Sequence, residues 1–225
     1  MPEFEPKPAS SLIPNWYRQT ESYTKNIKQP NGNGSSTGTI KRCMPVFDAM
    51  TTGYIITSYV DVWVSQKEQQ NDDGMNVIAP FYEWPSYKPI EFHPVIQAPL
   101  HPQNQNTPFP KWNNPWGIKT PPGYSVLFVP PMHREGLFTI LPGVVDTDTY
   151  FAPVNFPFVL NDSKFEGLIP AGTPIAQVIP FKRESWRIEL GNEEDRADIS
   201  KTLTRLRVKI FDSYKTLFRS SKDYK

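Results

Sequence analysis

Short runs of apolar residues alternate with turns rich in glycine and proline along most of this chain. Within several of these runs apolar and polar residues alternate, which is the period of a strand that is buried on one face. These patterns predict strands at residues 54–57, 59–65, 77–79, 124–129, 137–141, 144–145, 154–160 and 175–181. Short strands separated by such turns are typical of a β-sandwich or a β-barrel.

Two segments have helical features. Residues 44–52 predict a short helical turn, because Pro45 can occupy its first position and Gly53 follows its end. Near the other end of the chain, Asn192 can cap a helix whose acidic first turn suits the helix dipole. Apolar residues then recur at helical spacing: Ile199, Leu203, Leu206, Ile210 and Leu217. We expect one amphipathic helix of about 28 residues, about 42 Å long, which packs on its own barrel or on another subunit.

Two segments differ from the predicted strands. The first forty residues contain spaced prolines and a Gly/Asn/Ser run at 31–38, so we expect an extended arm and a flexible linker. Trp16 and Tyr17 predict that the arm docks on this chain or on a neighbour, because exposed aromatic side chains are costly. Residues 80–117 are rich in proline and predict a long irregular connection. The expected parts are an arm at 1–40, a β domain at 41–190 and a helix at 191–225.

Composition narrows the fold class. The chain has 25 prolines beside 14 Phe, 10 Tyr and 6 Trp. Proline disfavours helix interiors, while aromatic side chains suit strands and bury large areas. We therefore expect a mainly β protein with stiff connections.

Charge and cysteine content exclude several functions. The 24 basic and 23 acidic residues nearly cancel, and Lys182, Arg183 and Arg187 lie among acidic residues. This favours a salt-bridged strand end over a nucleic-acid contact. The chain has one cysteine, and its histidines, His93, His101 and His133, match no metal motif, so we expect no cofactor. Without a secretion signal or a membrane-length apolar run, we expect a soluble protein of the cytoplasm or of a virion.

Three blocks of the sequence carry a resemblance to a known superfamily. PPGYSVLFVPP, GVVDTDTY and GLIPAGTPIAQVIPF follow one another between Thr120 and Phe181. They resemble, in the same order, the signature segments of trimeric dUTPases and dCTP deaminases. This resemblance implies a β-clip fold, the small two-sheeted barrel of those enzymes, and a trimer. The blocks also resemble an uncharacterised family of phage and bacterial genomes.

The resemblance implies roles for three residues. In those enzymes the first aspartate of the signature deprotonates the attacking water, and Asp146 stands at that position. Their tyrosine packs under the deoxyribose, and Tyr150 corresponds to it. Asp148 is a further candidate ligand, with Mg²⁺ needed only if the chain hydrolyses nucleotides. The alternative is that Asp146 and Asp148 form a polar turn and cap backbone groups.

The sequence departs from the family pattern at its phosphate contacts. One extra residue separates Asp146 from Tyr150, and residues 130–136 replace the enzymes' phosphate-binding turn. Arg134, together with His133, is the candidate anion contact there, and the alternative is an exposed loop arginine. A charged helix replaces the enzymes' glycine-rich C-terminal arm, and the deaminases' catalytic glutamate has no counterpart.

Three functions follow from these observations. The first is a non-catalytic β-clip module, phage-related by its resemblance, that binds a nucleotide or a protein, with Asp146 and Arg134 in one pocket. The second is a structural or assembly protein of a virion, in contact with other virion proteins. The third is a nucleotide hydrolase or deaminase. We expect a homo-oligomer that associates through the N-terminal arm and the C-terminal helix.

Overall fold

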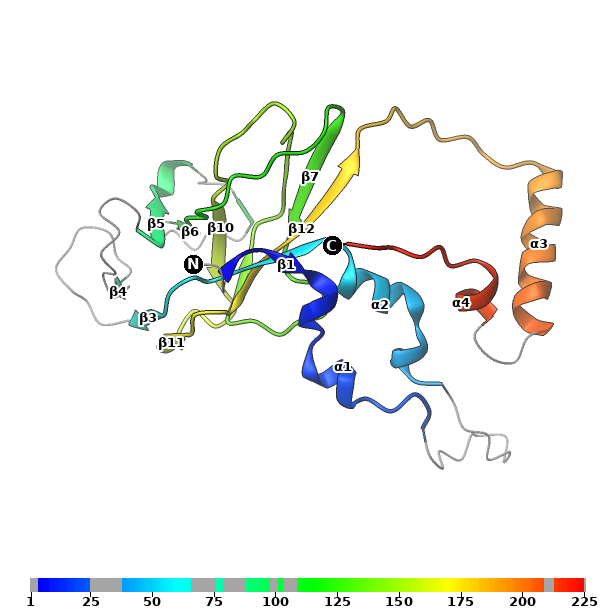
Figure 1. Ribbon diagram of the computed structural model, residues 1–225, viewed down its shortest axis with the longest axis horizontal. Coiled ribbons are helices and arrows are strands. Elements are labelled where there is room, and N and C mark those ends of the chain that lie inside the picture. Colours follow the sequence, from blue (N-terminus) through cyan, green and yellow to red (C-terminus); the bar gives the residue numbers. More distant parts are fainter. Residues whose placement is uncertain are drawn as a thin grey trace.

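The structure is a computed structural model, and it describes residues 4–24, 38–65, 76–78, 88–97, 101–102, 109–208 and 213–224. The described chain is mainly β, as the sequence predicts, with antiparallel strands in three sheets (Figure 1). Most of the linker predicted at 31–38 lies outside the described residues.

The largest sheet has five strands in the order β1-β2-β12-β7-β9. They are β1 (Lys7–Pro8), β2 (Tyr54–Thr57), β12 (Pro174–Lys182), β7 (Tyr124–Val129) and β9 (Gly143–Val145). β7 pairs with β12 on one side, with Lys182 opposite Tyr124, and with β9 on the other, with Val145 opposite Val126. One residue beyond these pairs, Arg183 comes level with Gly123 and Asp146 with Ser125. The pairing of three strands thus places the candidate site at one edge of this sheet.

Two smaller sheets complete the β structure. The four-stranded sheet has the order β5 (Ile90–His93), β6 (Phe109–Trp112), β10 (Phe156–Leu160) and β8 (Phe138–Ile140). The three-stranded sheet has the order β11 (Gly167–Ile169), β3 (Val62–Ser65) and β4 (Asn76–Ile78).

The prediction of one irregular connection at 80–117 was wrong where the structure describes it, because β5 and β6 lie within it and pair with each other. Ile90 and Trp112 stand opposite each other in this pair, and both are buried. The free energy of burying these side chains outweighs the low strand propensity of the surrounding prolines.

One hydrophobic core draws residues from all three sheets. Its centre is aromatic: the Trp112 ring stacks on Phe158 at 5.6 Å between centroids and packs against Phe138 at 5.3 Å. Trp112 is fully buried, so the segment that carries it is fixed to the body of the molecule.

The helix α2 (Met44–Thr51) confirms the predicted helical turn, with Pro45 in its first turn. Gly53 follows it with φ +73°, and a Cβ atom there would lie 2.0 Å from the carbonyl oxygen of Val178. The buried Gln177 side chain donates to the carbonyls of Ala49 and Thr52, 2.8 and 2.7 Å away. These bonds satisfy carbonyls that the end of a helix leaves without partners.

The described part of the N-terminal arm docks on its own chain. β1 pairs with β2, and the helix α1 (Asn15–Gln19) follows. Tyr17 is buried against Phe47, and the Trp16 indole donates to the carbonyl oxygen of His133, 2.8 Å away. Both aromatic side chains therefore have partners within the same subunit.

The C-terminal region differs from the predicted single helix of about 28 residues. α3 (Glu193–Val208) has 16 residues, and a second helix, α4 (Ser213–Leu217), follows it. Asn192 caps α3 as predicted, because its side-chain oxygen accepts from the backbone N–H groups of Glu194 and Asp195. The chain then returns to the body and ends beside α2 (Figure 1). There, Arg219 and Lys222 pair with Asp48. Among the described helices, none has the length and apolar character needed to cross a membrane.

Candidate functional site

The aspartates Asp146 and Asp148 lie in a tight turn directly after β9. The carbonyl oxygen of Asp146 accepts from the backbone N–H groups of Thr149 and Tyr150, at 3.1 and 2.8 Å. The Asp148 carboxylate accepts from the backbone N–H of Gly123 at 2.8 Å. A polar turn with backbone capping, one of the two interpretations of these residues, therefore describes the local geometry.

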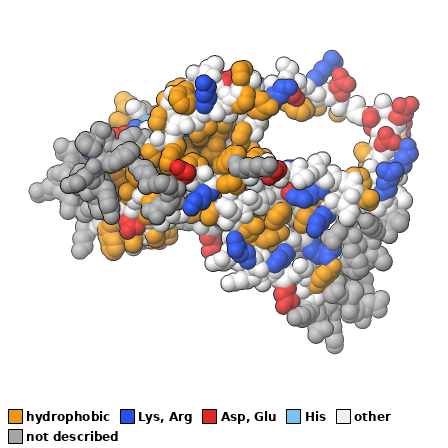
Figure 2. Space-filling view, in the orientation of Figure 1, with side chains coloured by type: hydrophobic (Ala, Val, Ile, Leu, Met, Phe, Trp, Pro, Cys, Tyr) orange, Lys and Arg blue, Asp and Glu red, His pale blue; other side chains and the backbone are white. Residues whose placement is uncertain are grey.

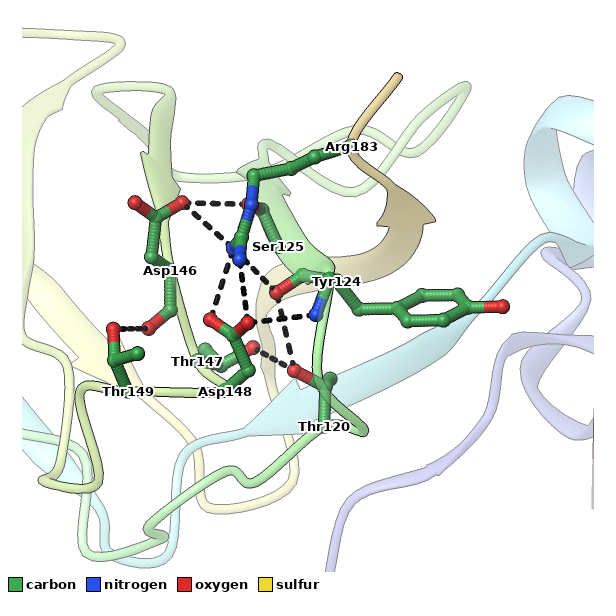
Figure 3. A network of polar contacts seen from close by, with 9 residues as sticks. Thr120, Tyr124, Ser125, Asp146, Thr147, Asp148, Thr149 and Arg183 are labelled. Carbon is green, nitrogen blue, oxygen red and sulfur yellow. Dashed lines mark hydrogen bonds and ion pairs between the residues drawn. The ribbon is translucent and has the colours of Figure 1, made fainter.

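Arg183 joins both aspartates from the end of β12 (Figure 3). Its guanidinium binds Asp148 through two nitrogens, one of them 2.9 Å from Oδ1, and it lies 3.3 Å from Oδ1 of Asp146. The same guanidinium donates to the carbonyl oxygen of Tyr124 at 2.9 Å and to the Ser125 hydroxyl at 3.1 Å. We call Asp146, Asp148, Ser125 and Arg183 the arginine network.

The two aspartates differ in exposure. The Asp148 side chain is 6% exposed, whereas that of Asp146 is 61% exposed. The Ser125 hydroxyl donates to Asp146 at 2.6 Å. Asp146 is therefore the carboxylate that a solute can reach.

The electrostatics of Asp148 follow from its partners. The hydrogen bonds from Arg183, and then that from the Gly123 N–H, lower the pKa of Asp148 from 3.8 to about 2. The paired carboxylate in turn raises the pKa of Arg183. A carboxyl group with so low a pKa is a weak proton acceptor at neutral pH, so Asp148 is poorly suited to be a general base.

The charged groups of the arginine network bind one another. Arg183 faces two carboxylates, and an incoming phosphate would have to displace them to reach the guanidinium. A bidentate arginine–carboxylate pair is among the stronger charge-assisted contacts in proteins. The arrangement therefore suits the fixing of one strand end better than the binding of an anion.

Arg134, the candidate anion contact, bonds to backbone groups of its own chain, and its role toward an anion stays a prediction. Its guanidinium donates to four backbone carbonyl oxygens, those of Ala9, Leu12, Met50 and Met132, at 3.0 to 3.4 Å. Burial lowers its pKa. Because these bonds tie the N-terminal arm to α2, the group is structural. The described hydrogen bonds of Arg134 and Asp146 go to different partners, and a pocket shared by the two stays a prediction.

The other predicted residues are His133, in the loop after β7, and Tyr150, in the turn of Asp146. His133 has a left-handed backbone conformation with φ 56°, and its carbonyl oxygen binds Trp16. Tyr150 and the neighbouring Phe151 are exposed. Within the described ranges, no group of three or more His, Cys, Asp or Glu side chains could hold a metal ion.

Sequence reasoning missed two features. It predicted a salt-bridged strand end at Arg183 but not that its partner is Asp148, because that contact depends on the pairing of β12, β7 and β9. It also gave no role to Asp48, which is buried in α2 and paired with two cations near the C-terminus, Arg219 and Lys222. An acidic residue among the apolar positions of a short helix was the available signal.

Comparison with known proteins adds no family. A scan against protein-family models found no match, and neither did a search of curated proteins.

Proposed function

We propose that this protein is a non-catalytic assembly module with a β-clip-like core, and that it forms a homo-oligomer through residues 184–208. We call these residues the free segment. The phage setting and contacts with other virion proteins stay predictions from the resemblance.

The observation that carries the proposal is the exposure of apolar side chains along the free segment. Trp186, Ile188 and Leu190 are 87, 94 and 97% exposed. They alternate with Arg187 and Glu189, so in an extended chain they lie on one face. Contiguous apolar surface of this kind marks an interaction site in a protein that stays in solution.

The helix α3 continues this surface. Ile199 and Leu203 stand four residues apart, which places them on one side of the helix, and both are exposed. Every residue from 181 to 205 is exposed, and Figure 2 shows an opening between this part of the chain and the rest of the described molecule. A second copy is the favoured partner because most soluble oligomers are built from identical subunits.

The arginine network supports the non-catalytic part of the proposal. Asp148 and Arg183 neutralise each other, and Arg134 is held by backbone carbonyls. Both arginines that could contact a triphosphate here, Arg134 and Arg183, are therefore already bound to other groups of the protein. The network instead fixes the point at which the free segment leaves β12.

The test is the mass of the native protein at micromolar concentration, measured by native mass spectrometry and light scattering. We expect an oligomer for the wild type. Trp186→Ser/Ile188→Ser/Leu190→Ser should be monomeric with an unchanged circular dichroism spectrum, because it removes only exposed apolar surface.

The matched control is Arg187→Ser/Glu189→Ser, which changes the other face of the same segment and should leave the oligomer intact. A wild-type protein that stays monomeric at 100 µM, on the order of ten times the working concentration, would overturn the proposal.

A further inference from the structure

We propose that the C-terminal tail, residues 213–224, docks on the body of a second copy rather than on its own, so that two copies exchange tails. This inference rests on the proposed function and names the contact through which the copies are joined.

The tail is held by a compact set of contacts around Asp48 in α2. Arg219 binds this carboxylate through Nε at 3.1 Å and Nη2 at 2.7 Å, and the Lys222 ammonium lies 2.9 Å away. We call Asp48, Arg219 and Lys222 the clasp. Two ring contacts flank it, Arg219 over Phe47 at 5.8 Å and Tyr224 against Tyr54 at 5.9 Å.

The clasp holds a carboxylate that is largely buried while the tail is in place. The Asp48 side chain is only 11% exposed, and its bonds to Arg219 lower its pKa, so it is ionised at neutral pH. A buried carboxylate without a cation is strongly destabilising. A bound tail provides the two cations that pair with this carboxylate, and the chemistry of the clasp is the same whether that tail belongs to the same copy or to another.

The two ends of the free segment are anchored in different ways. At its beginning, the chain is continuous with β12, which pairs with two other strands of the sheet. At its end, the described contacts of the tail with the body are side-chain contacts. The tail is thus the end that can be released, and the Ser213 hydroxyl, bound to the Leu206 carbonyl, joins it to α3.

The free segment has the properties of an exchange hinge. It carries exposed apolar side chains and is exposed from residue 184 to residue 205, so moving it costs few contacts within its own subunit. Nine extended residues before α3 span roughly 30 Å, and the helix adds about 24 Å, which is enough to reach a neighbouring body. In the closed form the segment is a loop fixed at both ends. Exchange opens that loop, lets the apolar face lie along the neighbour and restores every clasp contact.

The test mixes two variants with opposite defects. Asp48→Lys carries a wild-type tail, and Arg219→Glu/Lys222→Glu carries a wild-type body. Within one chain, each variant places like charges in the clasp. Between the two variants, one native clasp and one charge-reversed clasp can form. Native mass spectrometry of the mixture should show mixed oligomers enriched about tenfold or more over unmixed ones.

A second mixture keeps the test valid if either variant fails to fold. The charge-reversed chain Asp48→Lys/Arg219→Glu/Lys222→Glu can close its own clasp, and it is mixed with the wild type. Exchange predicts that mixed oligomers are depleted below the random proportion, because each exchanged clasp would join like charges.

Random proportions in both mixtures would overturn the exchange while leaving a homo-oligomer in place. A wild-type protein that is monomeric would instead overturn the proposed function and this inference together.

Discussion

At the scale of single residues, arginines bring together parts of the chain that lie far apart in sequence. Arg183 connects the ends of three strands through Tyr124, Asp146 and Asp148. Arg134 holds the N-terminal arm against α2 through backbone carbonyls. The planar guanidinium with several fixed donors makes both arrangements possible, and a lysine could not reproduce them.

The pairing of Asp148 predicts a pH dependence of stability. The pKa of this carboxyl is depressed in the folded state, from 3.8 to about 2. A depressed pKa contributes stability that is fully present above the unfolded-state value and is lost as pH falls through the folded value. We expect the wild type to lose stability between about pH 4 and pH 2.

The comparison is Asp148→Asn, which removes the titrating group. Urea unfolding of both proteins at pH 6, 4 and 3 measures their free energies of unfolding. The difference between the two free energies should become smaller as the pH falls. If the difference in the free energy of unfolding stays constant over this range, the ion pair between Asp148 and Arg183 does not cause the pH dependence.

At the scale of elements, β5 and β6 show how burial decides a segment that is rich in proline. Trp112 in β6 is fully buried between Phe138 and Phe158, whereas Trp63 in β3 is half exposed and stands opposite Leu168. In sequence, Trp63 lies between two valines and Trp112 between Lys111 and Asn113, so the local pattern does not mark Trp112 as the buried one. Only the packing of the sheets separates them.

This difference predicts unequal costs of truncation. Trp112→Ala should lower the free energy of unfolding by about 3–5 kcal/mol, because it removes transfer free energy and leaves a cavity. Trp63→Ala should cost about 1 kcal/mol or less, because only cross-strand contacts are lost. Urea titration monitored by circular dichroism measures both values. Equal costs would contradict the burial of Trp112.

The C-terminal helix shows where local periodicity reaches its limit. The apolar spacing from Ile199 to Leu217 predicts one helix, and the cap at Asn192 is found as predicted. The described residues form two helices, α3 and α4, and beyond them Arg219 and Lys222 bind Asp48. An ion pair across more than 170 positions of sequence leaves no local signal.

At the scale of the whole molecule, the β core and the C-terminal region are organised differently. The core is closed around buried aromatic side chains, whereas the free segment exposes Trp186, Ile188 and Leu190. This exposed apolar surface is the basis of the proposed assembly function.

This arrangement predicts the outcome of a nucleotide assay. Incubation with dUTP, dCTP and the ribonucleotides in the presence of Mg²⁺ should give no turnover above background. The reason is that Arg134 and Arg183, which could contact phosphate, are already bound to carbonyl and carboxylate oxygens of the protein. Asp146→Asn should behave like the wild type, and no nucleotide should raise the melting temperature. Chromatography of the products and thermal unfolding measure these results. Turnover that is lost in Asp146→Asn would restore the hydrolase interpretation.

The sequence by itself determined the mainly β class, most strand positions, the helix after Pro45 and the cap at Asn192. These depend on the spacing of neighbouring residues and on turn chemistry, which are local properties of the chain. Only the tertiary structure decided that Arg183 binds Asp148, that Arg134 binds carbonyls and that the tail returns to Asp48. Each of these contacts depends on which distant strands and helices become neighbours. The charge of a side chain follows from its identity, whereas its binding partner depends on which distant elements pack together.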